Sequence, residues 1–224
     1  MIRTYKLIFL LIRCQLLFLA SFFVSMKLEN SNNKSQDEEK VGVKAFDLSR
    51  LQEEVIIVPH SSEWQGWFET ESAALQEVFG NDALGIEHMG SSAVENLLSK
   101  PIVDILVGLK EFSISDEQIK GLELLGFEYF GQLHEGQERL FARKRGEQSF
   151  NISIVPYAGD EWVAKTAFRD YLRAHPDIVE AYSAIKNEAI AGGNDSLLQY
   201  HKHKDEFVTN TLATALSWHE AQGR

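Results

Sequence analysis

The chain has 224 residues, one cysteine and a net charge of −11 at pH 7. This length suits one well-packed domain, and a lone Cys14 excludes a disulfide framework or a cysteine-based zinc site. The negative charge argues against general nucleic-acid binding, which needs a basic surface.

Residues 1–25 form a doubtful hydrophobic segment at the amino terminus. An apolar run over residues 7–24 follows a basic start, as in a signal peptide or a short anchor. Arg13 interrupts the run, however, where charge is costly in a bilayer. Met26 is an alternative start, so we expect a misassigned start codon and a cytoplasmic protein. The alternative is a secreted or membrane-anchored protein, with membrane association only if residues 1–25 are genuine.

The polar residues 26–52 predict a flexible tail, and residues 53–221 are expected to form a single domain. A short strand is predicted at 54–58, followed by a helix at 62–79 with apolar residues at helical spacing. Later strands are predicted at 85–88, 101–107, 127–130, 139–143 and 150–155. Later helices are predicted at 115–125, 162–173, 176–191 and 196–221. This order indicates an α+β fold with a mixed β-sheet flanked by helices and a C-terminal helical segment.

Residues 87–109 contain most of the candidate ligand-binding residues. Gly90 lets the main chain approach a ligand closely, and the hydroxyls of Ser91 and Ser92 can donate to phosphate oxygens. A short helix over residues 93–98, capped by either serine, would add an anion-binding helix start. Asp104 is the only charged residue of an apolar strand, so it needs a partner or a cation such as Mg²⁺.

A structural interpretation of the same residues stays open. The serines can simply cap a turn, which is a common use of Gly-Ser pairs. Asp104 can be satisfied by Lys100 or by a backbone donor. His88 can likewise contact a ligand phosphate or a metal, although a lone strand histidine is more often a hydrogen-bonded structural residue.

The stretch from Glu87 to Ile105 resembles the signature of the GrpB family, which is assigned to the nucleotidyltransferase-like superfamily and also occurs fused to dephospho-coenzyme A kinase. The residues that carry this resemblance are Glu87-His88-Met89-Gly90-Ser91-Ser92-Ala93-Val94, Leu97 and Ser99-Lys100-Pro101-Ile102-Val103-Asp104-Ile105. Further similarity lies at Pro59 to Trp64, at Ala167 to Pro176, at Tyr182 and Lys186, and at Tyr200, Lys204 and Phe207-Val208. The resemblance runs from about Val55 to Trp218.

The resemblance implies a nucleotide site. Asp104 would be the catalytic residue and would hold Mg²⁺, with Glu87 as a second metal ligand. The implied phosphate-binding residues are Gly90, Ser91, Ser92, Lys100, Arg143 and Lys204. Lys186 and Tyr200 would lie beside Lys204, although a surface lysine packed over a tyrosine explains that pair equally well.

Two departures weaken the implied catalysis. Nucleotidyltransferases of this superfamily carry a second acid two residues after the first, on the same face of the strand, and this chain has Leu106 there. A later strand offers Asn151 and Ser153 in place of a third acid. Two-metal chemistry needs more acidic ligands.

Two functional readings follow. The first is Mg²⁺-dependent nucleotidyl transfer by an enzyme that binds a nucleotide or a phosphorylated small molecule. The second is a catalytically reduced binding or partner domain, for example one linked to coenzyme A metabolism. Arg169, Asp170 and Arg173 are predicted to form only helix-surface pairs.

Overall fold

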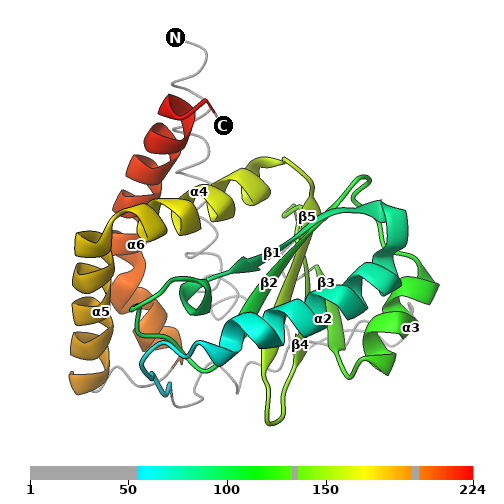
Figure 1. Cartoon of the computed structure of the whole chain (residues 1–224), viewed down its shortest axis with the longest axis horizontal. Coiled ribbons are helices and arrows are strands. Elements are labelled where there is room, and N and C mark those ends of the chain that lie inside the picture. The colour runs from blue at the N-terminus through cyan, green and yellow to red at the C-terminus, as the bar shows by residue number, and fades with distance from the viewer. Residues whose placement is uncertain (1–54, 133–135, 193–196, 224) are drawn as a thin grey trace, which may run out of the picture.

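The computed structural model describes residues 55–132, 136–192 and 197–223, which form one mixed β-sheet and five α-helices (Figure 1). The strands are β1 (Ala83–Met89), β2 (Val103–Leu109), β3 (Glu128–Gln132), β4 (Leu140–Lys144) and β5 (Phe150–Pro156). The helices are α2 (Glu63–Phe79), α3 (Asp116–Leu124), α4 (Asp160–Ala174), α5 (Pro176–Ala191) and α6 (Leu197–Ala221). The predicted α+β class is confirmed.

The strands lie in the order β1-β2-β5-β4-β3, with β2 and β5 parallel and the other neighbours antiparallel. The register places polar side chains side by side across the sheet. One cross-strand row, on a single face, consists of Met89, Asp104, Asn151, Arg143 and Glu128. The next row on the same face consists of Glu87, Leu106, Ser153 and Phe141.

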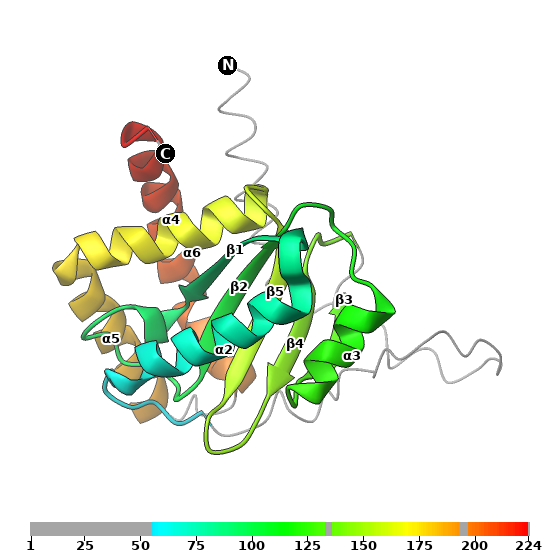
Figure 2. The ribbon, with the colours of Figure 1, turned by 45° about the vertical axis from the view of Figure 1, so that its right-hand side comes forward.

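The opposite face of the sheet carries the main hydrophobic core. Side chains at alternate positions of β2 and β5, among them Ile105 and Ile152, point to this face because successive residues of a strand alternate. Helices α2 and α3 cover it, with Trp64, Leu75 and Leu122 buried in the core (Figures 1 and 2). This packing explains why the face of β2 that carries Val103, Ile105 and Val107 is apolar.

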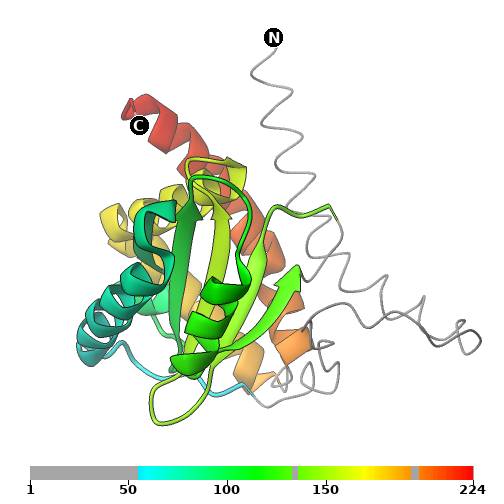
Figure 3. The same ribbon diagram turned by 90° about the vertical axis from the view of Figure 1, so that its right-hand side faces the viewer.

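Helices α4, α5 and α6 lie on the other side of the sheet, as the edge-on view shows (Figure 3). Pro176 occupies the first turn of α5, where its missing N–H costs no hydrogen bond, and it separates α5 from α4. Leu172, Val179 and Tyr182 from this helix pair pack on Val94 and Leu97. The C-terminal helices therefore pack directly against the segment that follows the Gly-Ser turn.

Two predicted elements differ from the structure. The predicted helix over residues 93–98 is wrong, because only a 3₁₀ turn over Ser91–Ala93 forms, and Val94 is already extended. Packing of Val94 and Leu97 against α4 and α5 overrides the local helical preference. The strand predicted at 54–58 is reduced, within the described residues, to a single bridge between Val58 and Ser99.

The amino-terminal predictions, for residues 1–25 and 26–52, fall outside the described residues. Among the helices that are described, none combines the length and apolar character needed to cross a bilayer.

Candidate functional site

Gly90 forms a turn between β1 and the 3₁₀ segment, and the carboxylate of Asp104 lies directly against it. Its φ of +69° and ψ of −168° belong to a region that only glycine adopts readily. A Cβ atom at this position would overlap the Asp104 carboxylate. Two constraints, backbone conformation and close contact, therefore both require glycine here.

Asp104 is held by neighbours in the cross-strand row. The Asn151 side-chain amide nitrogen donates to Asp104 Oδ1 over 2.8 Å, and Arg145 donates to the side-chain oxygen of Asn151, Oδ1, over 2.8 Å. Arg145 also donates to the main-chain oxygen of Phe150. Asp104 thus has an amide donor on one oxygen, supplied by the strand that carries Asn151 and Ser153 in place of a third acid.

Lys186 of α5 reaches the turn from the other side. Its Nζ lies 2.6 Å from Ser91 Oγ and 2.6 Å from the Leu98 carbonyl oxygen, and it sits over the Tyr182 ring. The residue is 1% exposed. Burial lowers the Lys186 pKa well below its ordinary value, and the charges of Lys204 and Lys100 lower it further, while Asp104 opposes them. Among the described residues, these direct contacts are to neutral groups.

Lys204 of α6 lies on the same side of the sheet. Its Nζ is 5.3 Å from the centre of the Tyr200 ring. Burial lowers the Lys204 pKa, and the nearby carboxylates of Asp104 and Asp205 raise it. Lys186 therefore feels the charges of Lys100, Lys204 and Asp104, and Lys204 feels those of Asp104 and Asp205.

Ser92 and His88 lie apart from this group. His88 Nε2 is 3.1 Å from Ser92 Oγ, its Nδ1 is 3.4 Å from Gln65 Oε1, and its ring stacks on Phe68 of α2. Both residues are buried. Burial lowers the His88 pKa to about 4, and the positive charges of Arg173 and Arg169 contribute. His88 is therefore neutral at pH 7, and its contacts are those of a structural histidine.

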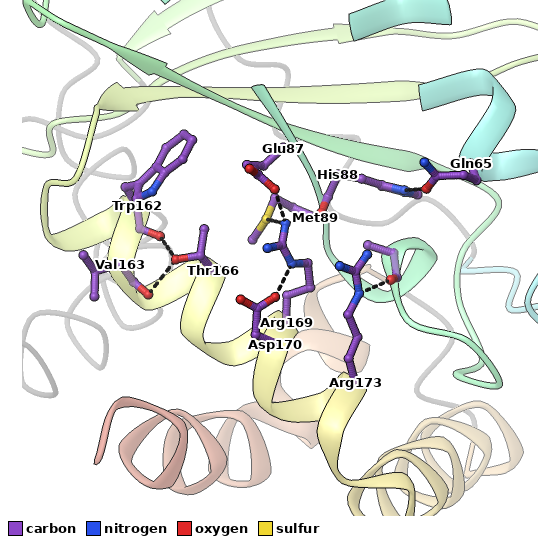
Figure 4. Close-up of polar contacts among 11 residues, drawn as sticks. Gln65, Glu87, His88, Met89, Trp162, Val163, Thr166, Arg169, Asp170 and Arg173 are labelled. Carbon is purple, nitrogen blue, oxygen red and sulfur yellow. Dashed lines mark hydrogen bonds and ion pairs between the residues drawn. The ribbon is translucent and has the colours of Figure 1, made fainter. Parts of the chain in front are cut away.

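Glu87 shares a face with Asp104, but it is engaged elsewhere. It stands opposite Leu106 across the β1–β2 pair, and its Oε2 lies 2.6 Å from an Arg169 guanidinium nitrogen (Figure 4). Leu106 is fully buried against Met89 and Val155. The described residues hold no group of three His, Cys, Asp or Glu side chains that could bind a metal ion.

Two further predicted residues lie on the same face of the sheet. Arg143 donates to Glu128 over 3.0 and 3.2 Å and lies over the Phe130 ring. Ser153 is the cross-strand neighbour of Leu106. In the described part of the chain, neither side chain forms a hydrogen bond with Ser91 or Lys186.

Sequence reasoning missed the role of Arg169. This residue was expected on a helix surface, but it is 8% exposed and contacts Glu87, Asp170, the His88 carbonyl oxygen and Met89 Sδ. The signal was its spacing of four residues from Arg173, which places both on one side of α4.

Comparison with known proteins gives consistent matches. Residues 54–214 match the family described as GrpB protein. The chain is 28% identical to the glutamate-rich protein GrpB of Alkalihalophilus pseudofirmus, over 71% of this chain and 94% of that protein. It is 27% identical to UPF0157 protein YqkA of Bacillus subtilis, over 73% of this chain, and spans about half (48%) of that longer relative.

Two other matches concern a solved structure and a longer enzyme. The crystal structure of the conserved protein GrpB from Enterococcus faecalis superposes with a TM-score of 0.65 and 30% identity, covering 73% of this chain and 99% of that one. A dephospho-CoA kinase of Mycobacterium bovis is 23% identical over 74% of this chain and 47% of the kinase.

Proposed function

Because the chain belongs to the GrpB family, we propose that it binds a phosphorylated small molecule of the nucleotide class at the Gly90–Ser91 turn beside Asp104. One observation carries this proposal. The amino group of Lys186 is buried at the turn, 2.6 Å from Ser91 Oγ, and its direct partners among the described residues are uncharged. Burial without an opposite charge disfavours the ammonium form and lowers the Lys186 pKa, and a ligand phosphate would supply the charge that favours this form.

The local charge supports an anionic ligand. The whole protein carries −11, yet Lys100 and Lys204 both lie near enough to Lys186 to lower its pKa, which the charge of Asp104 opposes. Lysine binds phosphate as a point charge, and the Ser91 hydroxyl can donate a hydrogen bond to a phosphate oxygen. The overall negative charge favours a small ligand over a nucleic-acid chain.

The donor set around Asp104 does not fit a magnesium ion well. Mg²⁺ prefers oxygen ligands in octahedral geometry, whereas Asp104 faces the amide nitrogen of Asn151 and positive lysines. Leu106 replaces the second acid, and Glu87 is paired with Arg169. Our proposal therefore stops at binding. Magnesium and nucleotidyl transfer, with Asp104 as the catalytic residue, stay predictions that the experiment below includes.

The second candidate is a partner domain linked to coenzyme A metabolism. It rests on the match to a longer protein named dephospho-CoA kinase, of which this chain spans about half (47%). Dephospho-coenzyme A contains an adenine nucleotide, so this candidate uses the same ligand chemistry at the same turn.

The test is a thermal-shift and calorimetric titration of the full chain with pyrophosphate, ATP and dephospho-coenzyme A, each with and without Mg²⁺. A ligand at 100 times its Kd should stabilise the fold by about 2.7 kcal/mol. Lys204→Met should reduce the shift. The matched control is Lys202→Met, because Lys202 is exposed on the same helix, and it should leave the shift unchanged.

The outcomes distinguish ligand binding alone from nucleotidyl transfer. If none of the three probes raises the melting temperature, the binding proposal is overturned. A shift that is independent of Mg²⁺ and retained in Asp104→Ala supports binding without transfer. A shift that requires both Mg²⁺ and Asp104, together with pyrophosphate release from ATP, would instead support nucleotidyl transfer.

A further inference from the structure

Two arginines of α4 contact the Gly-Ser turn from both of its ends. Arg169 donates through one terminal nitrogen to Glu87 Oε2 over 2.6 Å and to the His88 carbonyl oxygen over 3.1 Å, just before the turn. Arg173, one helical turn later, donates through Nε to the carbonyl oxygen of Ala93, the last residue of the turn, over 2.9 Å. Figure 4 shows both side chains reaching from α4 toward this segment.

The guanidinium group of Arg169 is buried, and its partners fix its orientation. Its guanidinium is neutralised on two sides, by Glu87 and by Asp170 at 2.8 Å. Its remaining contacts are to the His88 carbonyl oxygen and Met89 Sδ. A planar guanidinium group has several N–H donors in fixed directions and can therefore make all four contacts at once. The single ammonium group of a lysine could not. An exposed helix-surface pair would require no such geometry.

The turn has few constraints of its own. It consists of Gly90, in a conformation that glycine enters without strain, and a 3₁₀ segment of three residues. Hydrogen bonds within it run from Ala93 to Gly90 and from Val94 to Ser91. Its position relative to Asp104 and Lys186 therefore depends on groups outside it.

We infer that Arg169 and Arg173 are positioning residues that fix the Gly90–Ala93 turn, so that Ser91 is presented to the ligand next to Lys186. This inference rests on the proposed function for its ligand. Arg169 holds the end of β1, Arg173 holds the start of the following segment, and Lys186 holds Ser91 between them. A turn held in its binding conformation loses less entropy when the ligand binds.

The decisive variant is Arg173→Met, because Arg173 is exposed and its replacement leaves no buried charge unpaired. It should weaken pyrophosphate binding by about tenfold. Arg173→Lys should not restore binding fully, since a lysine lacks the Nε donor. Lys165→Met is the matched control on the same helix, where Lys165 pairs with Glu161, and it should bind pyrophosphate like the parent.

A double-mutant cycle with Ser91→Ala distinguishes positioning from general stability. If Arg173 acts by presenting Ser91, Ser91→Ala should cost much less affinity in the Arg173→Met background than in the parent. Independent, additive losses would overturn the inference, as would unchanged affinity of Arg173→Met.

Amide hydrogen exchange tests the positioning role of Arg173 independently of ligand binding. If the parent protein does not bind pyrophosphate, the proposed function fails. The positioning role is then judged by amide exchange at residues 90–94. Faster exchange in Arg173→Met than in Lys165→Met supports it, and equal exchange in the two variants overturns it.

Discussion

Lys186 Nζ lies 2.6 Å from Ser91 Oγ, although 95 residues separate them in the chain. This contact joins α5 to the turn after β1. Because Lys186 is 1% exposed, replacing it tests both the cost of its burial and its value for binding.

Lys186→Met should change stability little and binding strongly. The variant loses two hydrogen bonds to Ser91 and Leu98, but it also removes the cost of burying an amino group. These terms oppose each other, so the free energy of unfolding should change by about 1 kcal/mol or less. Pyrophosphate affinity should fall by about tenfold or more. Urea denaturation and calorimetric titration measure the two effects. A fully retained affinity would contradict the assigned role.

Gly90→Ala should destabilise the fold by about 2–4 kcal/mol. The added Cβ meets the Asp104 carboxylate, and the backbone angles are unfavourable for alanine. Combining it with Asp104→Ala should recover part of the loss, because the overlapping carboxylate is removed. Gly66→Ala is the control, since nothing lies near its Cβ position in α2. It should be neutral or stabilise by up to about 1 kcal/mol. Equal effects at Gly66 and Gly90 would refute the close contact.

The free energy of unfolding should decrease as the pH falls, because His88 is buried in its neutral form. Its pKa is lowered from 6.5 to about 4, so the unfolded chain takes up a proton at a higher pH than the folded protein does. The contribution is complete above pH 6.5 and is lost as the pH falls toward about 4. Between pH 8 and pH 5 the loss should be about 2 kcal/mol.

Urea denaturation at several pH values measures this effect. His88→Gln should flatten this part of the profile, while His203→Gln, at an exposed position, should leave it unchanged. A profile that is the same in both variants would count against the neutral, buried state of His88.

Leu106→Asp should not create a metal site, even though it restores the acid spacing of nucleotidyltransferases. Leu106 is fully buried with Met89, Val155 and Trp162. A carboxylate there should lower the free energy of unfolding by about 3 kcal/mol or more. Leu106→Met, of similar volume, should cost less than about 1.5 kcal/mol. Chemical denaturation compares the two, and an Asp variant as stable as the Met variant would show that the position tolerates an acid.

Much of the fold was predictable because its signals are local. Ser115 caps α3 and forms a reciprocal capping box with Gln118, and Pro176 marks the start of α5. The strand order was not predictable, since the parallel pairing of β2 with β5 joins segments that are distant in the chain. Only the assembled sheet aligns Asp104 with Asn151.

The candidate site was predictable only in part. The motif identified Gly90, Ser91 and Asp104, and the resemblance to the GrpB family added Lys186 and Lys204. Ser92 does not join Ser91 beside Lys186, because in the 3₁₀ turn its hydroxyl lies against His88. The spacing of Arg169 and Arg173 places both on one side of α4, but the burial of Arg169 depends on how α4 docks on β1, which this spacing does not specify.

The contact between Lys186 and Ser91 also has a consequence for biosynthesis. During translation the sheet strands emerge first, and the lysines of α5 and α6 follow them. A ribosome-bound intermediate can thus build the glycine turn and Asp104 while lacking every lysine that the C-terminal helices supply. Any ligand that depends on those lysines would stabilise the finished protein selectively and leave truncated products without protection.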